Sequence, residues 1–275
     1  MKKYVVLDKN IGQTPLQCME YWRSTQSEQY QNIPLTYAGR LDPLASGKLL
    51  ILIGNECKKK EEYLNLDKEY QFSVLFGMRS DTADVMGRLT QDTSLVSPIT
   101  RKQLNKETKS FIGNIELPYP HFSSKTVQGK PLHTWAAEGR IGEIKIPTKC
   151  STVYNLRCID AYTETRNDVY IQSLKNINSI AEVTELRKAL GNDFRRDDVR
   201  KDWDIFLNTG SKDDVFYIAT FTCICSSGTY MRTLAEKIGE RIGVSSLAYS
   251  INRTIIGKYK PLPFIGGIWC KQYRK

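Results

Sequence analysis

Hydrophobic and polar residues alternate along some stretches of this chain and recur with helical spacing along others. From Lys68 to Phe76 the apolar and aromatic residues occupy every second position, which is the period of a strand with one buried face. Phe216 to Cys225 is apolar, β-branched and aromatic, and Leu49 to Ile53 is an uninterrupted aliphatic run, so both predict buried strands. Helical patterns lie between these strands. The chain therefore predicts a mixed α and β fold.

Capping residues fix the starts of two predicted helices. Thr14 and Pro15 provide an N-cap and a first-turn proline for a helix that reaches about Trp22. Thr100 and Gln103 have the spacing of a capping box. Further helices are expected over residues 56–66, 97–111 and 132–138, and further strands over 4–7, 152–159 and 247–256.

Three regions carry other local signals. Residues 163–214 are rich in charge and resemble an insertion, with a helix expected over 180–190. This segment could form a binding element for a polyanion, but a solvated loop of mixed charge is the favoured interpretation. Residues 226–229 predict a turn and the cap of a following helix. Residues 261–267 carry only the glycines and prolines of a loop.

The charge of the chain favours a polyanionic partner. The 275 residues include 40 lysines and arginines against 30 aspartates and glutamates, a net charge of +10. Basic surfaces bind phosphates with release of counterions, although many only keep a protein soluble. The longest aliphatic run is too short to cross a membrane, and no secretory signal is evident, so we expect an intracellular protein of the cytoplasm or an organelle such as the mitochondrion.

The cysteines indicate a reducing compartment. Seven cysteines, an odd number, are scattered along the chain and do not suggest a disulfide framework. Cys223 and Cys225 are separated by a single residue, which is too close for a zinc knuckle, so we expect no metal site.

Asp42 is the strongest candidate for chemistry. It lies between Leu41 and Pro43, with Arg40 beside it. The proline restricts its own φ and biases Asp42 towards extended geometry. A fixed carboxylate suits a nucleophile, although the local sequence alone fits a turn aspartate that accepts backbone hydrogen bonds equally well or better.

Four ordered blocks place Asp42 in a wider context. They are YAGRLDPLASG at 37–47, KEYQF at 68–72, GMRSDTAD at 77–84 and SGTYMRTLA at 227–235. Together they resemble the TruB family of tRNA pseudouridine synthases. The resemblance runs from Val5 to Lys258, is interrupted by the charged insertion, and includes VQGKPL at 127–132. It implies an α+β pseudouridine synthase fold with a mixed, largely antiparallel sheet flanked by helices and loops.

The resemblance also implies a domain organisation. We expect one catalytic domain over residues 1–275, with the insertion at about 163–214 and without the small C-terminal RNA-binding PUA domain that many relatives carry.

The resemblance assigns roles to individual residues. Asp42 matches the family nucleophile, Arg232 the arginine that pairs with it, and Tyr70 the tyrosine that stacks on the target base and has been suggested to transfer a proton. We expect Asp42 and Arg232 to form a buried pair in a closed pocket. Lys9 matches a lysine near the site and Ile251 a hydrophobic residue lining it, although a surface lysine and a plain core residue fit almost as well.

Some positions depart from the family pattern. Tyr37 stands where the family usually has histidine, and the phenol has different charge and hydrogen-bonding geometry. Lys125, His133 and Ala137 also differ from the residues typical of the block around position 129, which puts some RNA contacts in doubt. We expect Tyr37 and Arg40 to contact the substrate.

The implied activity is conversion of uridine to pseudouridine at position 55, in the T-loop of tRNA. This isomerisation gains and loses no atoms or electrons, so we expect no cofactor. We expect tRNA as partner, no membrane, no obligatory protein partner and a monomer. Two alternatives stay open: a catalytically weak or inactive TruB-like RNA-binding or assembly protein, and a pseudouridine synthase that acts on another RNA.

Overall fold

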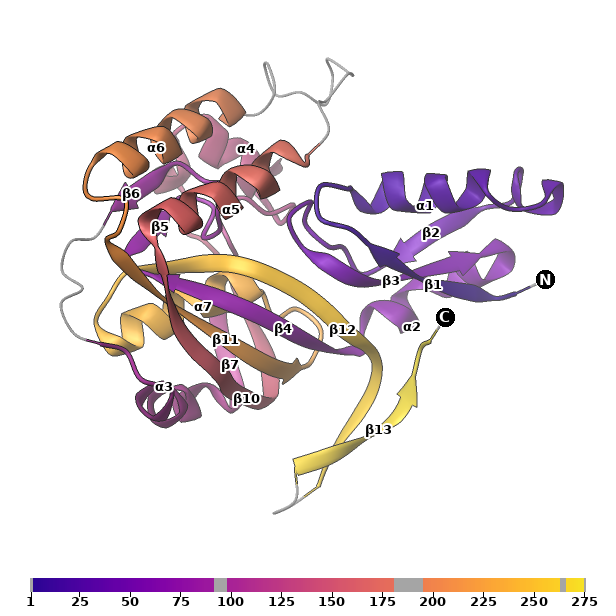
Figure 1. Cartoon of the computed structure of the whole chain (residues 1–275). Coiled ribbons are helices and arrows are strands. Elements are labelled where there is room, and N and C mark those ends of the chain that lie inside the picture. Colours follow the sequence, from indigo (N-terminus) through magenta and orange to yellow (C-terminus); the bar gives the residue numbers. More distant parts are fainter. Residues whose placement is uncertain (1, 92–97, 181–194, 263–265, 275) are drawn as a thin grey trace.

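A computed structural model describes residues 2–91, 98–180, 195–262 and 266–274. Within these residues a nine-stranded sheet has the order β1-β3-β12-β4-β11-β10-β7, with β2 beside β3 and β13 beside β12 (Figure 1). The strands are β1 (Tyr4–Lys9), β2 (Leu35–Ala38), β3 (Ser46–Ile53), β4 (Asp67–Phe76), β7 (Gly113–Pro118), β10 (Thr148–Thr165), β11 (Val215–Cys225), β12 (Ser246–Leu262) and β13 (Gly266–Gln272). All pairs are antiparallel except β12 with β3. The predicted α+β fold with a mixed, largely antiparallel sheet is confirmed.

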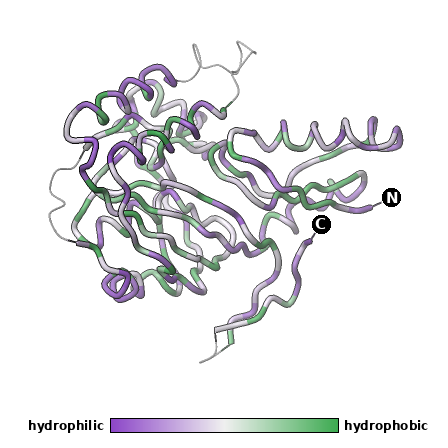
Figure 2. Tube along the Cα trace, viewed as in Figure 1, coloured by the Kyte–Doolittle hydropathy of each residue, from purple (hydrophilic) through white to green (hydrophobic). Residues whose placement is uncertain are grey.

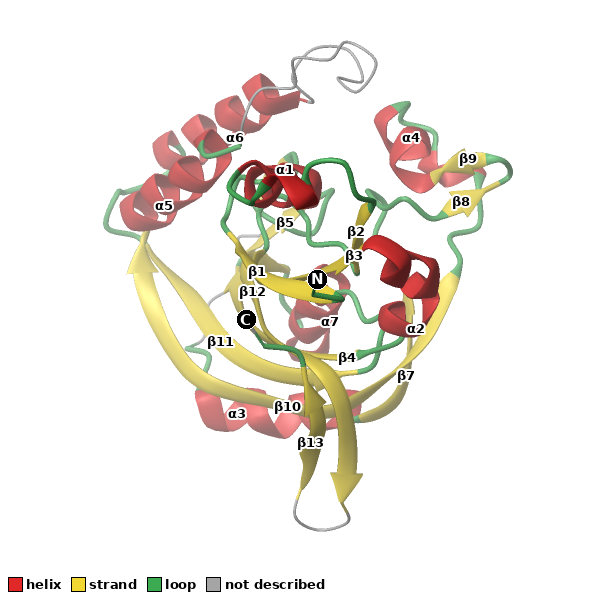
Figure 3. Cartoon of the chain, turned by 90° about the vertical axis from the view of Figure 1, so that its right-hand side faces the viewer, coloured by secondary structure: helices red, strands yellow, loops and turns green. Residues whose placement is uncertain are grey.

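Helices and short hairpins surround this sheet. The helices are α1 (Pro15–Ser24), α2 (Lys60–Leu64), α3 (Arg101–Glu107), α4 (Leu132–Ala137), α5 (Arg166–Asn178), α6 (Arg196–Asn208) and α7 (Met231–Ile242). Two small hairpins are β5 (Met78–Ser80) with β6 (Leu89–Gln91), and β8 (Thr126–Val127) with β9 (Lys130–Pro131). Single turns of 3-10 helix span 28–30, 54–59, 108–111 and 141–143. Figure 3 shows the α5–α6 pair and the α4 segment on opposite sides of the N-terminal strands.

The predicted caps form as expected. The Thr14 side chain accepts a hydrogen bond from the Gln17 backbone in a full capping box, with Pro15 in the first turn of α1. The Thr100 side chain accepts from the Gln103 backbone and starts α3. The cap of α7 is different: Tyr230 is its N-cap, and the predicted cap within 226–229 is wrong. The Thr229 hydroxyl instead donates to the Ser226 carbonyl, which closes the turn before the helix.

The central strands divide the core into two layers. One face of β4 carries the predicted alternating set Tyr70, Phe72, Val74 and Phe76, which packs with α3, α7, β10 and β11. The opposite face packs under α5 and α6. Figure 2 shows the hydrophobic positions concentrated along these strands, whereas α3 is mostly hydrophilic. The sheet is thus covered on both faces, as its long apolar strands require.

The described part of the charge-rich segment 163–214 is not a solvated loop. Val199, Trp203 and Phe206 on α6 are buried and join a hydrophobic cluster with residues of β4 and β11. The charges between them hid this apolar set, which follows the spacing of one helix face. The helix expected over 180–190 lies almost wholly outside the described residues, and α5 ends before it, at Asn178.

The C-terminal segment is another correction. The sequence predicts a loop over 261–267, but Leu262 ends β12 and Gly266 begins β13. β13 pairs antiparallel with β12, and the two form a projecting hairpin (Figure 1). β13 begins with two glycines and none of its residues is fully buried, so its own sequence gives little strand signal and the pairing with β12 makes it a strand. β10 and β12 also run longer than predicted, because β-bulges break their alternation.

Candidate active site

The loop between β2 and β3 presents Asp42. The turn from Asp42 to Ala45, which contains Pro43, is closed by a hydrogen bond from the Ala45 backbone N–H to the Asp42 carbonyl, 3.0 Å long. Gly47 ends the loop with φ +100°, a left-handed conformation that favours glycine. A Cβ at Gly47 would lie 2.2 Å from the Arg253 carbonyl oxygen, so only glycine fits between the two paired strands.

Arg232, in the first turn of α7, reaches this loop from the opposite side of the site. Its Nε lies 2.9 Å from Asp42 Oδ2. The guanidinium also donates to the carbonyls of Thr82 and Phe122, at 2.9 and 3.2 Å. Burial opposes the charge, but Asp42 and Asp84 outweigh it and raise the pKa of Arg232. The guanidinium therefore stays a cation fixed by four contacts.

The pair is buried on one side only. The Arg232 side chain is 6% exposed, whereas that of Asp42 is 48% exposed. The expectation of a buried Asp42 in a closed pocket is therefore wrong. The physical reason is that Pro43 and the turn after it carry Asp42 at the surface of the loop, while α7 carries Arg232 inside the core. A carboxylate that pairs with Arg232 on one side and is exposed to solvent on the other is accessible to a large substrate.

Asp84 is a second carboxylate at this guanidinium, with Oδ2 3.7 Å from Arg232 Nε. Its Oδ1 accepts from the Thr82 hydroxyl at 2.6 Å and from the Met86 backbone at 3.0 Å. Burial raises the pKa of Asp84, although Arg232 acts in the opposite direction. Asp84 lies in the sequence block at 77–84, but the sequence alone gave this residue no role.

Tyr70 and Ile251 lie in the same neighbourhood. The Tyr70 ring packs in the core cluster that contains Leu41, next to Asp42. Ile251 and Asp42 line one pocket together with Asp84. Burial raises the pKa of Tyr70, and the positive charge of Arg253 partly offsets this, so the phenol holds its proton. Burial therefore favours a stacking and hydrogen-bonding tyrosine.

Lys9 is buried and is not a surface lysine. Its ammonium donates to the carbonyls of Asn10, Gln13 and Pro43, at 2.9, 2.7 and 3.2 Å. Burial lowers the pKa of Lys9 to about 8, against the attraction of nearby Asp42. Lys9 thus holds the backbone directly after the carboxylate.

Arg253 on β12 holds the other side of the loop, and sequence reasoning missed it. Its guanidinium donates to the carbonyls of Lys48, Arg40 and Gly39, at 2.7, 3.4 and 3.3 Å. The side chain is almost fully buried. Buried arginines are rare unless paired, but a single arginine in a strand gives no local signal of burial.

Tyr37 and Arg40 lie farther out. Tyr37, on β2, packs partly buried beside Leu49 and Ile51, with the Lys60 ammonium 5.5 Å from its ring centre. Arg40 is exposed on the loop that carries Asp42. The structure pairs Asp42 with Arg232 and places Ile251 in the pocket that Asp42 lines, with Lys9 beneath the loop. Tyr70 lies in the core cluster beside Leu41, and Tyr37 lies on the neighbouring strand.

In the described part of the chain, no group of three or more His, Cys, Asp or Glu side chains is arranged to hold a metal ion. None of the described helices has the length and apolar content needed to span a bilayer. The chemistry that the site offers is that of a positioned carboxylate beside a fixed cation and an aromatic ring.

Comparison with known proteins identifies the family. Residues 29–177 match the profile described as TruB family pseudouridylate synthase (N terminal domain), which is more than half of the 275-residue chain. The chain belongs to the TruB family. The predicted family is thereby confirmed.

Curated TruB relatives match over much of the chain. The tRNA pseudouridine synthase B of Caldicellulosiruptor saccharolyticus is 29% identical over 201 residues, covering 69% of this chain and 67% of the relative. That of Shouchella clausii is 28% identical over 255 residues, covering 93% and 67%. That of Blochmanniella floridana is 30% identical over 231 residues, covering 81% and 65%. The chain thus spans about two thirds of the length of these TruB proteins.

Among solved structures, a Cbf5-Nop10-Gar1 complex contains a chain that resembles this TruB protein with a TM-score of 0.52. The identity is 15%, and the match covers 92% of this chain and 48% of the other. At this identity the likeness supports the fold alone.

Proposed function

We propose that this protein isomerises uridine to pseudouridine in tRNA, at position 55 of the T-loop, with Asp42 as the nucleophile. The observation that carries the proposal is the half-exposed Asp42 carboxylate, held at 2.9 Å by the buried guanidinium of Arg232. A nucleophilic carboxylate has to be ionised, oriented and open to its substrate. Arg232 orients the carboxylate, and the exposed side of Asp42 leaves it open to a substrate.

The reaction needs no group from outside the chain. The N1–C1′ bond of the nucleotide breaks, the base turns, a C5–C1′ bond forms, C5 gives up a proton and N1 gains one. Asp42 bonds covalently to the nucleotide while the base turns, and this bond breaks again when the product forms. Arg232 stabilises the carboxylate that is released. Tyr70 offers its ring to the everted base, since stacking offsets part of the cost of extracting a base from the loop.

The substrate contacts divide into two kinds. Arg40, exposed beside Asp42, is placed to meet the RNA backbone, and Tyr37 contributes a partly buried ring at the neighbouring strand. Lys9 acts through the loop that it holds, because its ammonium is used by three backbone carbonyls. The net charge of +10 favours the approach of a polyanion.

The test uses the whole chain and an unmodified tRNA transcript. Asp42→Asn keeps the size of the side chain but removes the nucleophile, so folding and tRNA affinity should persist while pseudouridine disappears. Asp213→Asn, an exposed aspartate in the loop before β11, is the matched control and should be as active as the native chain. Carbodiimide labelling followed by reverse transcription locates the product.

Four outcomes separate the alternatives. Pseudouridine at position 55 that is lost in Asp42→Asn supports the proposal. Product that persists in Asp42→Asn rejects the nucleophile. A native chain that binds tRNA without modifying it supports an RNA-binding protein, and product found only in total RNA supports a different RNA substrate.

A further inference from the structure

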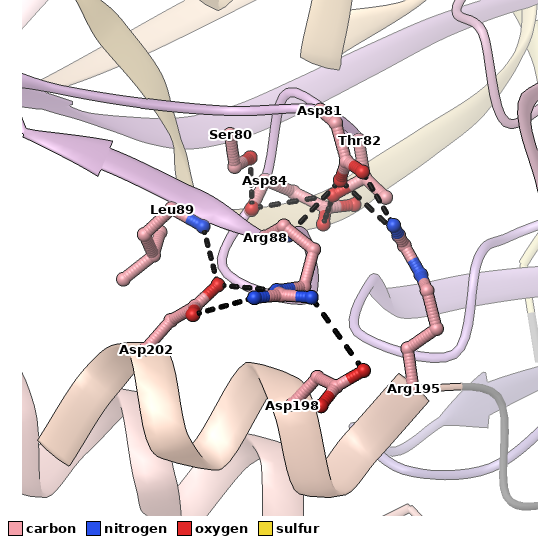
Figure 4. Close-up of polar contacts among 9 residues, drawn as sticks. All are labelled: Ser80, Asp81, Thr82, Asp84, Arg88, Leu89, Arg195, Asp198 and Asp202. Atoms are coloured by element: carbon pink, nitrogen blue, oxygen red, sulfur yellow. Dashed lines mark hydrogen bonds and ion pairs between the residues drawn. The ribbon is translucent and has the colours of Figure 1, made fainter. Parts of the chain in front are cut away.

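Helix α6 of the inserted segment is fastened to the loop between β5 and β6. Asp202 accepts two hydrogen bonds from the Arg88 guanidinium, at 2.7 and 3.1 Å, and a third from the Leu89 backbone at 3.0 Å (Figure 4). Asp198 adds an ion pair to Arg88 at 3.5 Å. Trp203, fully buried, donates its indole N–H to the Val85 carbonyl at 3.1 Å. The helix therefore grips the second half of this loop.

Arg195, at the start of α6, grips the first half. Its guanidinium makes two hydrogen bonds with the Asp81 carboxylate, at 2.5 and 3.1 Å (Figure 4). The same guanidinium lies over the ring of Phe122, 4.6 Å from its centre. Arg195 thus joins two segments that are distant in sequence, the loop at 81 and the segment at 122.

Arg232 joins the same two segments from the inside. It donates to the Thr82 carbonyl, one residue after Asp81, and to the carbonyl of Phe122 itself. Arg195 and Arg232 therefore form an outer and an inner clasp on one pair of backbone segments. The inner clasp is the residue that orients Asp42.

The clasped loop has a conformation that needs support. Ala83 has φ +60°, a left-handed conformation that is unfavourable for a residue with a Cβ. Ala83 lies between the Thr82 carbonyl and the Asp84 carboxylate, the two groups of this loop that Arg232 contacts. The Ala83 backbone donates to the Ser80 carbonyl and accepts from Ala248 on β12, at 3.2 and 3.0 Å. Arg195 and α6 add contacts on either side of it, at Asp81 and at Arg88.

We propose that Arg195 is a positioning residue for catalysis: by tying Asp81 and Phe122 together, it fixes the frame in which Arg232 holds Asp42. The inserted helix pair is then part of the catalytic architecture of this chain. The proposal rests on the proposed function, because its kinetic consequence is a slower reaction at Asp42.

The proposal leads to expectations for the melting temperature, the reaction rate and the tRNA affinity of the Arg195→Ala variant. Exposed ion pairs contribute little to global stability, so Arg195→Ala should leave the melting temperature nearly unchanged. A small displacement of a catalytic group lowers the rate far more, so the single-turnover rate on tRNA should fall about tenfold, with the tRNA dissociation constant within about twofold of native.

The experiment compares Arg195→Ala with Arg200→Ala, an arginine one turn along α6 that pairs with Asp197. Both variants remove a guanidinium from the same helix. Hydrogen exchange across residues 80–89, measured without RNA, should quicken in Arg195→Ala and stay native in Arg200→Ala. The charge exchange Arg195→Asp with Asp81→Arg should restore slow exchange and part of the rate.

The outcomes distinguish the two proposals. A native chain that makes no pseudouridine overturns the proposed function, while the exchange measurement still tests the clasp. An active native chain whose Arg195→Ala variant keeps its rate and its slow exchange overturns the positioning role. A variant that loses tRNA affinity at an unchanged rate also overturns it, because Arg195 would then bind RNA directly.

Discussion

Asp84 Oδ2 lies 3.7 Å from Arg232 Nε, and the two side chains are 10% and 6% exposed. One guanidinium thus serves two carboxylates with different surroundings, since Asp42 is open to solvent and Asp84 is enclosed. In the proposed reaction, Asp84 would balance the charge of Arg232 while Asp42 is bonded to the nucleotide. The pair therefore ties the stability of the fold to the chemistry of the site.

Arg232→Ala should destabilise the protein by about 3–5 kcal/mol, because it leaves Asp84 buried without a cation. Adding Asp84→Asn removes the stranded charge and should restore most of that loss, measured by urea unfolding. Pseudouridine formation should stay absent in both variants, since Asp42 has lost its partner. A double variant as unstable as the single one would contradict this account.

Lys9→Met should lower the rate of pseudouridine formation and the stability together. The substitution removes the hydrogen-bond donor of three carbonyls, including that of Pro43. Because buried acceptors are then unsatisfied, the free energy of unfolding should fall by at least about 1–3 kcal/mol. Lys48→Met is the control, because that lysine is half-buried and pairs with Asp8 at the surface. Unfolding curves and single-turnover rates should separate the two variants, and equal losses would refute the role of Lys9.

Gly47→Ala should destabilise the chain by more than about 2 kcal/mol, because it combines an unfavourable φ with a steric overlap. The new Cβ would meet the Arg253 carbonyl oxygen at 2.2 Å. Gly142→Ala is the matched control, since a Cβ there meets nothing within 4 Å. Thermal unfolding of both variants measures the difference, and similar melting temperatures would count against the close strand pairing.

Glu236→Gln should stabilise the protein at pH 8 but not at pH 4.5. Burial raises the pKa of Glu236 on α7 to about 6, so its contribution to stability is present below pH 4.5 and is lost as the pH rises through 6. Glutamine avoids the buried charge and should gain about 1–2 kcal/mol above pH 7. Unfolding free energies across this pH range should show the gain appear between 4.5 and 7; a gain independent of pH would exclude titration as its cause.

Much of the fold could be predicted because its signals are local. Thr14 and Thr100 cap their helices through backbone groups three residues away, and the alternation from Lys68 to Phe76 reports directly which face is buried. β13 could not be predicted, because its partner strand rather than its own pattern makes it a strand. The burial of Trp203 could not be predicted either, because charged residues surround the apolar face of its helix.

The residues of the candidate site also differ in how far the sequence could predict them. Asp42, Arg232 and Tyr70 lie in blocks that resemble a known family, and the structure brings them into one neighbourhood. Asp84 and Arg253 have no motif that reveals their partners, because those partners are distant in sequence. The half-exposed state of Asp42 also depends on how two distant elements meet, which residue patterns do not encode.

Lys9 and Arg253 hold the Asp42 loop through main-chain oxygens rather than through side chains. Such a grip does not depend on which side chains the loop carries at its outward positions. Under the proposed function, a substitution of the exposed Arg40 side chain would therefore alter which RNA is preferred while the Asp42 loop keeps its position.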